Sequence, residues 1–300
     1  MKKTDEKRAM LSLCSSMLIF GSIGLFVKYV DLPSAWIAAV RGGVGTLFLL
    51  LFVLITGKKI SGKAIRANFL WLVLSGAAIG FNWILLFEAY RYTTVAVATV
   101  CYYMEPVFVM LLSPILLKEK LTARKSLCCL VALCGMVLVS GLLTGGLGNT
   151  AVKGPLFGLG AAALYTTAIF LNKRLKNITA YDRTIVQLGI AAIVVLPYAL
   201  ISQKVSFTSL SPMQYVWLAV IAIVHTGIAY ALYFGSMDAL ESQTIAVFSY
   251  IDPAFAVLLS VLVLREDTGI LEILGAALIL GSTFFCEFRP KKKPLNKESA

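Results

Sequence analysis

Two carboxylates, each followed by a proline, are the residues best suited to chemistry in this chain. Glu105-Pro106 and Asp252-Pro253 lie inside apolar runs long enough to cross a bilayer. Charge is unfavourable in the hydrocarbon layer, so ionisable residues there usually bind a solute or carry a proton. We therefore expect Glu105 and Asp252 to face a central cavity and to bind a cationic or amino-bearing substrate, or a proton. The architectural alternative is that each acid and its proline only bend a helix and make a polar contact between two halves.

The two acids occupy equivalent positions of an internal repeat. The segment 103–119 begins Tyr-Met-Glu-Pro and ends Leu-Lys-Glu. A similar segment, which aligns with it without a gap, occupies residues 250–266. Such self-similarity indicates one structural unit present twice. We predict a first five-helix repeat over residues 1–146 and a second one, with a basic tail, over 147–300.

The composition places these repeats in a membrane. Hydrophobic residues make up 59% of the chain, charged residues 14%, and the mean hydropathy is +0.86, which a soluble surface cannot accommodate. Ten apolar segments of about 20 residues fit the thickness of a bilayer; they are 9–30, 34–56, 68–90, 93–117, 125–143, 154–171, 180–202, 211–234, 242–264 and 270–288. The predicted fold class is an all-α integral membrane protein with ten transmembrane helices. Because five is odd, the copies enter the membrane with opposite orientation, as two inverted five-helix repeats that can support alternating access.

The net charge of +12 also fits a membrane protein. With the N-terminus in the cytoplasm, nearly all Lys and Arg fall on the cytoplasmic side; apart from Arg41, which lies within a span, the exceptions are Lys28, Arg91, Lys153, Lys204 and Arg265. This asymmetry predicts a multi-pass protein with both termini in the cytoplasm. No nucleic-acid partner is needed to explain the basic charge.

Two further ionisable residues lie within predicted spans. Arg41 needs an acceptor for its guanidinium, and the candidates are a structural ion pair with Glu88 or a carboxylate on the substrate. His225 is the sole histidine and lies mid-span, where it either relays a proton or is a hydrogen-bonded packing residue.

Aromatic and amide side chains near the centres of the spans complete the set of candidate residues. They could line a cavity for apolar or cationic solutes through their ring faces, although core packing is the default for any single one; they are Asn82, Trp83, Tyr102, Tyr165, Tyr230 and Tyr250. Pro106 and Pro253 are expected to bend their helices about one turn before the acids. The six cysteines have no metal-ligand spacing and are expected to be packing residues. We predict no cofactor and no metal.

With these motifs the chain resembles the drug/metabolite transporter superfamily, specifically its EamA branch of ten-helix permeases, over nearly its whole length. The resemblance rests on Glu105-Pro106 to Lys118-Glu119, on Asp252-Pro253 to Arg265-Glu266, and on Arg41 in the second helix, with Lys28 and Lys173 ending the first and sixth. It implies a bacterial plasma-membrane transporter of amino acids, other metabolites or drugs, built around a central cavity. One departure is that Lys118 and Arg265 stand where the family usually has Gly.

The leading hypothesis is a secondary active transporter that exports a small metabolite by alternating access, with proton exchange as an option. Uptake of a cationic solute such as a quaternary amine, held by aromatic rings, is the alternative within transport. A receptor or structural membrane protein is the alternative of another class. The sequence holds no HExxH motif, no second histidine and no serine paired with a base, so we predict that it is not an enzyme. The oligomeric state, monomer or homodimer, stays open.

Overall fold

A computed structural model describes residues 3–116, 122–139, 152–202, 210–237 and 242–287, together with Val205 and Leu240. Over these residues the secondary structure is helical and contains no strand. Several positions discussed above lie outside the described residues: Lys118-Glu119, the boundary between 146 and 147, Lys204 and the basic tail from 288.

The first copy contributes five spans. Their helices are α1 (Lys3–Lys28), α2 (Ser34–Ile55), α4 (Phe69–Tyr92), the pair α5 (Val95–Tyr102) and α6 (Glu105–Leu116), and α7 (Ala123–Val139). A short connecting helix, α3 (Gly62–Ala67), precedes α4 and was not predicted. Its N-cap is Ser61, whose side chain accepts a hydrogen bond from the Ala64 amide.

The second copy repeats this order. Its helices are α8 (Lys153–Asn172), α9 (Ala180–Ser202), the continuous series α10 (Pro212–Ala219), η2 (Val220–Ile228) and α11 (Ala229–Met237), the pair α12 (Ser242–Ser249) and α13 (Ile251–Leu262), and α14 (Ile270–Glu287). The nine-residue π-helix η2 was not predicted. A capping box formed by Ser211 and Gln214 starts this span, with Pro212 in its first turn.

Length and hydropathy support the membrane assignment. Seven helical stretches are long and apolar enough to span a bilayer, and Ser126–Leu138, Ile251–Leu262 and Ile270–Ser282 are shorter apolar helices. These ten segments coincide with the ten predicted spans. The prediction of an all-α membrane protein built from two copies of five spans is therefore confirmed.

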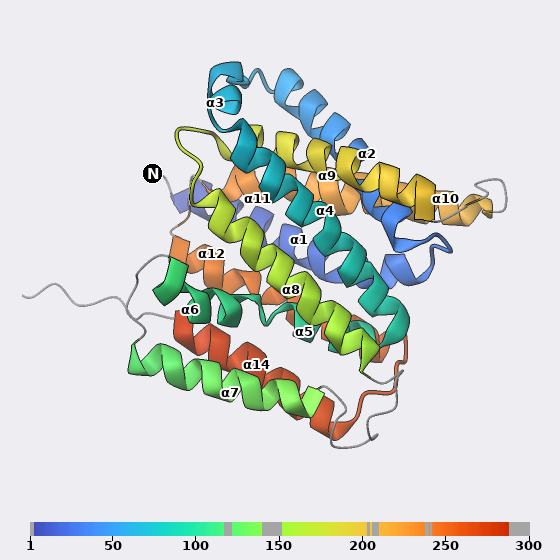
Figure 1. The fold of residues 1–300 in the computed structure, drawn as a ribbon, viewed down its shortest axis with the longest axis vertical. Helices are drawn as coiled ribbons and strands as arrows, with labels where there is room; N and C mark the ends of the chain where they lie inside the picture. Colours follow the sequence, from blue (N-terminus) through green and yellow to red (C-terminus); the bar gives the residue numbers. More distant parts are fainter. Residues whose placement is uncertain are drawn as a thin grey trace, which may run out of the picture.

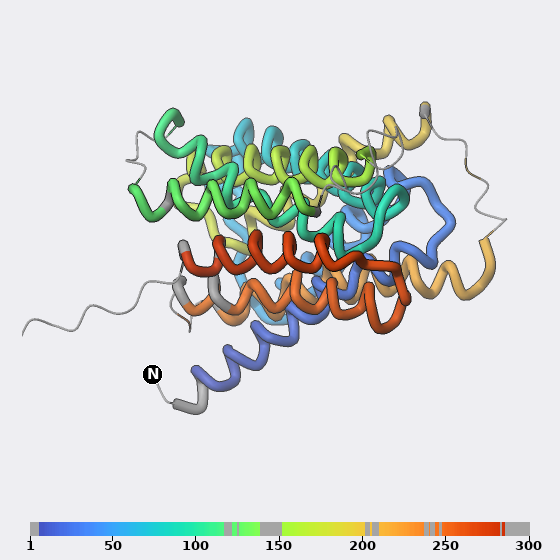
Figure 2. The backbone as a smooth tube through the Cα atoms, turned by 90° about the horizontal axis from the view of Figure 1, so that it is seen from below, coloured from blue at the N-terminus to red at the C-terminus, as the bar shows by residue number. Residues whose placement is uncertain are grey.

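Eight spans surround the centre, and two pack against each other at the edge. In Figures 1 and 2, α7 and α14 lie side by side at the margin of the bundle. Their contact is close, since a Cβ added to Gly135 would lie 2.7 Å from the Gly275 carbonyl oxygen. In the centre, α4 lies alongside α8 and also contacts α9 (Figure 1), so helices from the two copies pack against each other.

The two ends of the bundle are tied by different sets of contacts. At one end, the Asn68 side chain donates to the Lys176 carbonyl over 2.8 Å, and its oxygen accepts from the Lys176 amide over 2.9 Å. At the other end, Arg91 donates to the Leu32 carbonyl, and Lys28 pairs with Glu266. We refer to these as the Lys176 end and the Lys28 end.

Candidate functional site

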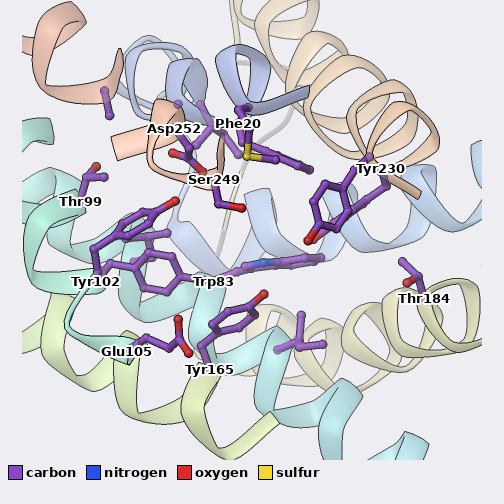
Figure 3. Close-up of a pocket in the computed structure, with 18 of the residues that line it drawn as sticks. Phe20, Trp83, Thr99, Tyr102, Glu105, Tyr165, Thr184, Tyr230, Ser249 and Asp252 are labelled. Carbon is purple, nitrogen blue, oxygen red and sulfur yellow. The ribbon is translucent and has the colours of Figure 1, made fainter. Parts of the chain in front are cut away.

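The centre of the bundle encloses a cavity of about 420 Å³, within the size range of small-molecule sites. Residues from eight spans line it, and among the described residues α7 and α14 contribute none. Figure 3 shows how the labelled side chains converge from helices of both copies. The cavity joins the two copies at one site.

Both repeated acids line this cavity. Glu105 is the first residue of α6 and follows the interruption of the helix between α5 and α6. Asp252 is the second residue of α13, which follows a similar interruption of the helix at Tyr250. Pro106 and Pro253 lie in the first turn of α6 and α13, where the missing N–H of proline is tolerated. Pro106 lines the cavity and Pro253 does not. In the view of Figure 3 the two carboxylates approach the cavity from opposite sides.

Each acid's backbone packs on the first helix of the other copy. The Thr166 hydroxyl on α8, which donates to the Ala162 carbonyl of its own helix over 2.8 Å, lies 3.4 Å from the Glu105 carbonyl oxygen. At the equivalent place on α1, a Cβ added to Gly21 would lie only 2.4 Å from the Asp252 carbonyl oxygen. The two interrupted spans, α5–α6 and α12–α13, are therefore contacted at their interruptions by equivalent helices, α8 and α1.

Aromatic rings form much of the cavity wall. Ring centroids are 5.7 Å apart for Tyr102 and Tyr165 and 5.2 Å apart for Phe20 and Tyr230. Of the predicted aromatic residues, Trp83, Tyr102, Tyr165, Tyr230 and Tyr250 all line the cavity. Tyr165 keeps 37% of its surface exposed, which is a large fraction for a tyrosine at the centre of a bundle.

Arg41 lies in the same wall, with only 5% of its surface exposed. Its Nε donates to the Thr226 hydroxyl oxygen over 2.8 Å, and its guanidinium carbon lies 4.3 Å from the Trp83 ring centroid. Among the described residues no ion pair joins Arg41 to Glu88. The reason is helical geometry: Trp83 and Phe87 turn toward Arg41, and Glu88 is rotated by about 100° from Phe87.

Two predicted residues do not line the cavity. Asn82 is buried and its Nδ2 donates to the Ala161 carbonyl over 2.6 Å, so it joins α4 to α8. His225 lies on η2, with Nε2 3.0 Å from the Ser22 hydroxyl and Nδ1 3.2 Å from the Val220 carbonyl oxygen. Both side chains make structural contacts between spans.

Several lining residues were missed in the sequence. Arg183 lies within the predicted span 180–202 and was counted only among the charges on the cytoplasmic side, but near the start of α9 it lines the cavity. Repeat equivalence would have found two others, because Tyr103 corresponds to Tyr250 and Gln187 corresponds to Arg41. The same equivalence would have found two more, because Phe20 corresponds to Tyr165 and Ser249 corresponds to Tyr102. No comparable signal identifies the remaining polar or aromatic lining residues, which are Tyr90, Thr99, Asn172, Thr184, Tyr233 and Phe234.

At the Lys28 end of the bundle, a polar cluster forms around Glu266, which does not itself line the cavity. Its Oε1 lies 2.7 Å from Lys28 Nζ, and its Oε2 accepts bonds from the Val95 amide over 2.8 Å and the Ser260 hydroxyl over 2.6 Å. This carboxylate joins the ends of α1 and α13 to the start of α5. Toward the Lys176 end, by contrast, the cavity reaches Asn172 and Arg183.

The cysteines and the acids form no metal site within the described part of the chain. Cys101, Cys128 and Cys129 are buried, as expected for packing residues, whereas Cys134 is exposed and Cys14 is intermediate. The side chain of Cys286 lies outside the described residues.

Comparison with known families identifies both halves. The model of the "EamA-like transporter family" matches residues 7–141 and, a second time, 152–287. The predicted boundary between 146 and 147 lies in the gap between these matches and stays a prediction.

Individual relatives are transporters. The "Uncharacterized transporter YxxF" of Bacillus subtilis (strain 168) is 30% identical over 277 residues, which cover 92% of this chain and 88% of that protein. The "Uncharacterized transporter YoaV" of the same organism is 25% identical over 94% of this chain and 97% of its own length. A solved crystal structure at 20% identity has a TM-score of 0.63 and covers 92% of this chain and 94% of its own, which shows a common fold.

Proposed function

The chain belongs to the EamA-like transporter family, and on this premise we propose that it exports small metabolites such as amino acids, amines or drugs by alternating access. The family assignment makes it a multi-pass membrane transporter of small molecules and not an enzyme, as the sequence predicted. Export, alternating access, proton exchange and the roles of individual residues belong to the proposal.

One observation carries this function: a single cavity collects Glu105 from the first copy and Asp252 from the second. Carboxylates inside a bilayer are retained where they face a binding site or a water-filled cavity. Aromatic rings beside them favour an organic ammonium group, because a ring face attracts cations. The same carboxylates can bind a proton when the substrate leaves, which provides a route to proton exchange.

Inverted halves explain the reciprocal contacts at the two breaks. The α1 helix packs on α13 at Gly21 and Asp252, and α8 packs on α6 at Thr166 and Glu105. In such a pair, each half can adopt the shape of the other, and the binding site stays at the interface. The contacts around Glu266 hold the Lys28 end together, and the cavity extends toward Arg183. Both features favour a state in which the cavity faces the Lys176 end.

The distribution of Lys and Arg assigns the Lys176 end to the cytoplasm. The cavity then faces the cytoplasm in this state, where an exporter takes up its substrate, and both termini lie on the same side. The bacterial relatives favour the plasma membrane of a bacterium as its location. Monomer and homodimer are both compatible with this proposal.

Uptake of a quaternary amine is the second candidate. The rings of Trp83, Tyr102, Tyr165 and Tyr230 around one cavity favour it, since methylated ammonium groups bind to aromatic cages. The direction of transport distinguishes uptake from export. A receptor would bind the solute without transporting it.

Reconstituted protein tests the proposal. Proteoliposomes loaded with the twenty standard amino acids, putrescine and choline are placed in a pH gradient, and each solute outside is measured by mass spectrometry. We expect protein-dependent efflux of at least one component, and we expect Glu105→Gln and Asp252→Asn to lower its initial rate by at least tenfold. The matched control is Glu88→Gln, since Glu88 does not line the cavity.

Two outcomes would contradict the proposal. Inward movement of choline alone would establish the uptake function instead. Unchanged efflux by Glu105→Gln and Asp252→Asn, at normal expression, would assign both acids to architecture.

A further inference from the structure

Arg41 is a buried cation in the cavity wall, and no carboxylate of the described residues lies within salt-bridge distance of it. We propose that Arg41 is an anion subsite that binds the substrate's carboxylate, so the transported solute is a zwitterionic amino acid. This inference deepens the proposed function and rests on it.

The hydrogen bond to Thr226 fixes one part of the guanidinium. The Thr226 hydroxyl donates its single hydrogen to the Ile221 carbonyl over 3.2 Å, so its oxygen accepts from Arg41 Nε over 2.8 Å. The Ile221 bond spans five residues within the π-helix η2. Thr226 thus holds the guanidinium by Nε and leaves the four N–H groups of the two terminal nitrogens for another acceptor.

The Trp83 ring packs against the guanidinium group. The guanidinium carbon lies 4.3 Å from the ring centroid, as in a cation–π contact. A guanidinium can stack on an aromatic ring through its face while it binds a carboxylate at its edge through two parallel hydrogen bonds. Trp83 and the substrate carboxylate can therefore contact Arg41 at the same time.

Electrostatics favours an anion at this position. A buried guanidinium in the bilayer interior is strongly unfavourable unless it is paired and hydrogen-bonded. Among the described residues, four formally charged side chains line the cavity: the cations Arg41 and Arg183 and the acids Glu105 and Asp252. Their formal charges sum to zero, which suits a solute that carries one positive and one negative group. An ammonium group bound by the acids and a carboxylate bound by Arg41 would satisfy both sides.

The second copy holds no equivalent anion subsite. Gln187 occupies the position that corresponds to Arg41, and its Nε2 donates over 2.6 Å both to the Ser75 hydroxyl oxygen and to Asn172 Oδ1. Its amide nitrogen is therefore already used within the protein. At this pair of equivalent positions only Arg41 is charged, which favours one orientation of the bound amino acid.

Matched sets of probes test the inference by thermal stabilisation of the purified protein. Each of the twenty standard amino acids is titrated, and every one that stabilises is compared with its amine and its acid; for leucine these are isopentylamine and 4-methylpentanoate. We expect the wild type to bind the amino acid at least about tenfold more tightly than the amine, since a hydrogen-bonded charged group is lost. Arg41→Gln should remove this preference while binding of the amine is kept.

Two further variants keep the test decisive if Arg41→Gln folds poorly. Thr226→Val keeps the arginine but removes its Nε acceptor, and we expect it to reduce the preference for the amino acid partially. Arg174→Gln is the matched control, because Arg174 also lies over a tryptophan, 5.7 Å from the Trp71 ring centroid, but does not line the cavity. It should leave the preference unchanged.

The inference is overturned if no amino acid stabilises the wild type, if the amine binds as tightly as the amino acid, or if Arg41→Gln keeps the full preference. Its failure is distinguishable from failure of the proposed function. Efflux of putrescine or choline that is insensitive to Arg41→Gln would refute the anion subsite alone, whereas absence of any flux would refute export.

Discussion

Lys28 and Glu266 form an ion pair of 2.7 Å between the end of α1 and the turn after α13. The pair is partly buried, with 30% of the Lys28 side chain and 12% of the Glu266 side chain exposed. Glu266 also accepts the Val95 amide, so one carboxylate holds three elements that each continue into the cavity wall. If the proposed alternating access opens this end, these contacts must break together.

We predict that Glu266→Gln makes the Lys28 end open more often. Loss of an ion pair of about 1 kcal/mol raises the open population about fivefold. The measurement is the rate at which a membrane-impermeant maleimide, added from the Lys28 side, labels Thr99→Cys in a background without native cysteines. Glu272→Gln is the control, because Glu272 accepts the Gly269 amide and makes no ion pair within the described residues. An unchanged labelling rate in Glu266→Gln would show that the pair does not hold this end closed.

The number and position of the spans could be predicted because hydropathy alone decides them. Each span must be apolar over about 20 residues to lie in lipid, and the structure confirms all ten to within a few residues at most of their ends. The repeat likewise identified Glu105 and Asp252 as equivalent positions, and both line one cavity. Their binding role stays a prediction.

The direction in which a side chain points could not be predicted from the sequence. Asn82 and Trp83 are neighbours on α4, yet Trp83 lines the cavity and Asn82 contacts α8, because successive residues are rotated by about 100°. Apolar residues lie on all sides of α4, so no periodic pattern marks its side toward the cavity. The π-helix η2 depends on hydrogen bonds between residues five apart, for which the sequence has no simple signal.

Replacement of Arg265 by glycine should stabilise the protein. Arg265 has a φ of 52°, in the left-handed region that costs a non-glycine residue about 1–2 kcal/mol. After the entropy that glycine adds to the unfolded chain, we expect a gain of about 0.5–1 kcal/mol, measured as a rise in Tm of about 2 °C. Arg265→Ala should give no gain, since alanine is equally strained. A fall in Tm for Arg265→Gly would mean that the arginine side chain stabilises the folded protein by more than the left-handed backbone conformation destabilises it.

Substitution of Gly21 by alanine should weaken the contact between α1 and α13. The new Cβ would lie 2.4 Å from the Asp252 carbonyl oxygen, and a backbone atom cannot move as a flexible side chain can. Overpacking of this kind costs about 1–3 kcal/mol, so we expect a lower Tm together with reduced flux. Gly43→Ala is the control in α2, because its Cβ would meet no atom within 4 Å. Equal stability of the two variants would exclude a close α1–α13 contact at Asp252.

His225 should not be the residue that couples transport to protons. It does not line the cavity, and its two ring nitrogens contact Ser22 and the Val220 carbonyl oxygen. We predict that His225→Phe keeps the pH dependence of efflux, while its Tm falls because two hydrogen bonds of about 1 kcal/mol each are lost. Asp252→Asn should instead flatten the pH profile, since an amide cannot bind the proton that leaves when substrate enters. The measurement is the initial efflux rate between pH 5.5 and 8.5 in the same proteoliposomes. A flat profile for His225→Phe, with a normal one for Asp252→Asn, would move the proton site from the cavity to η2.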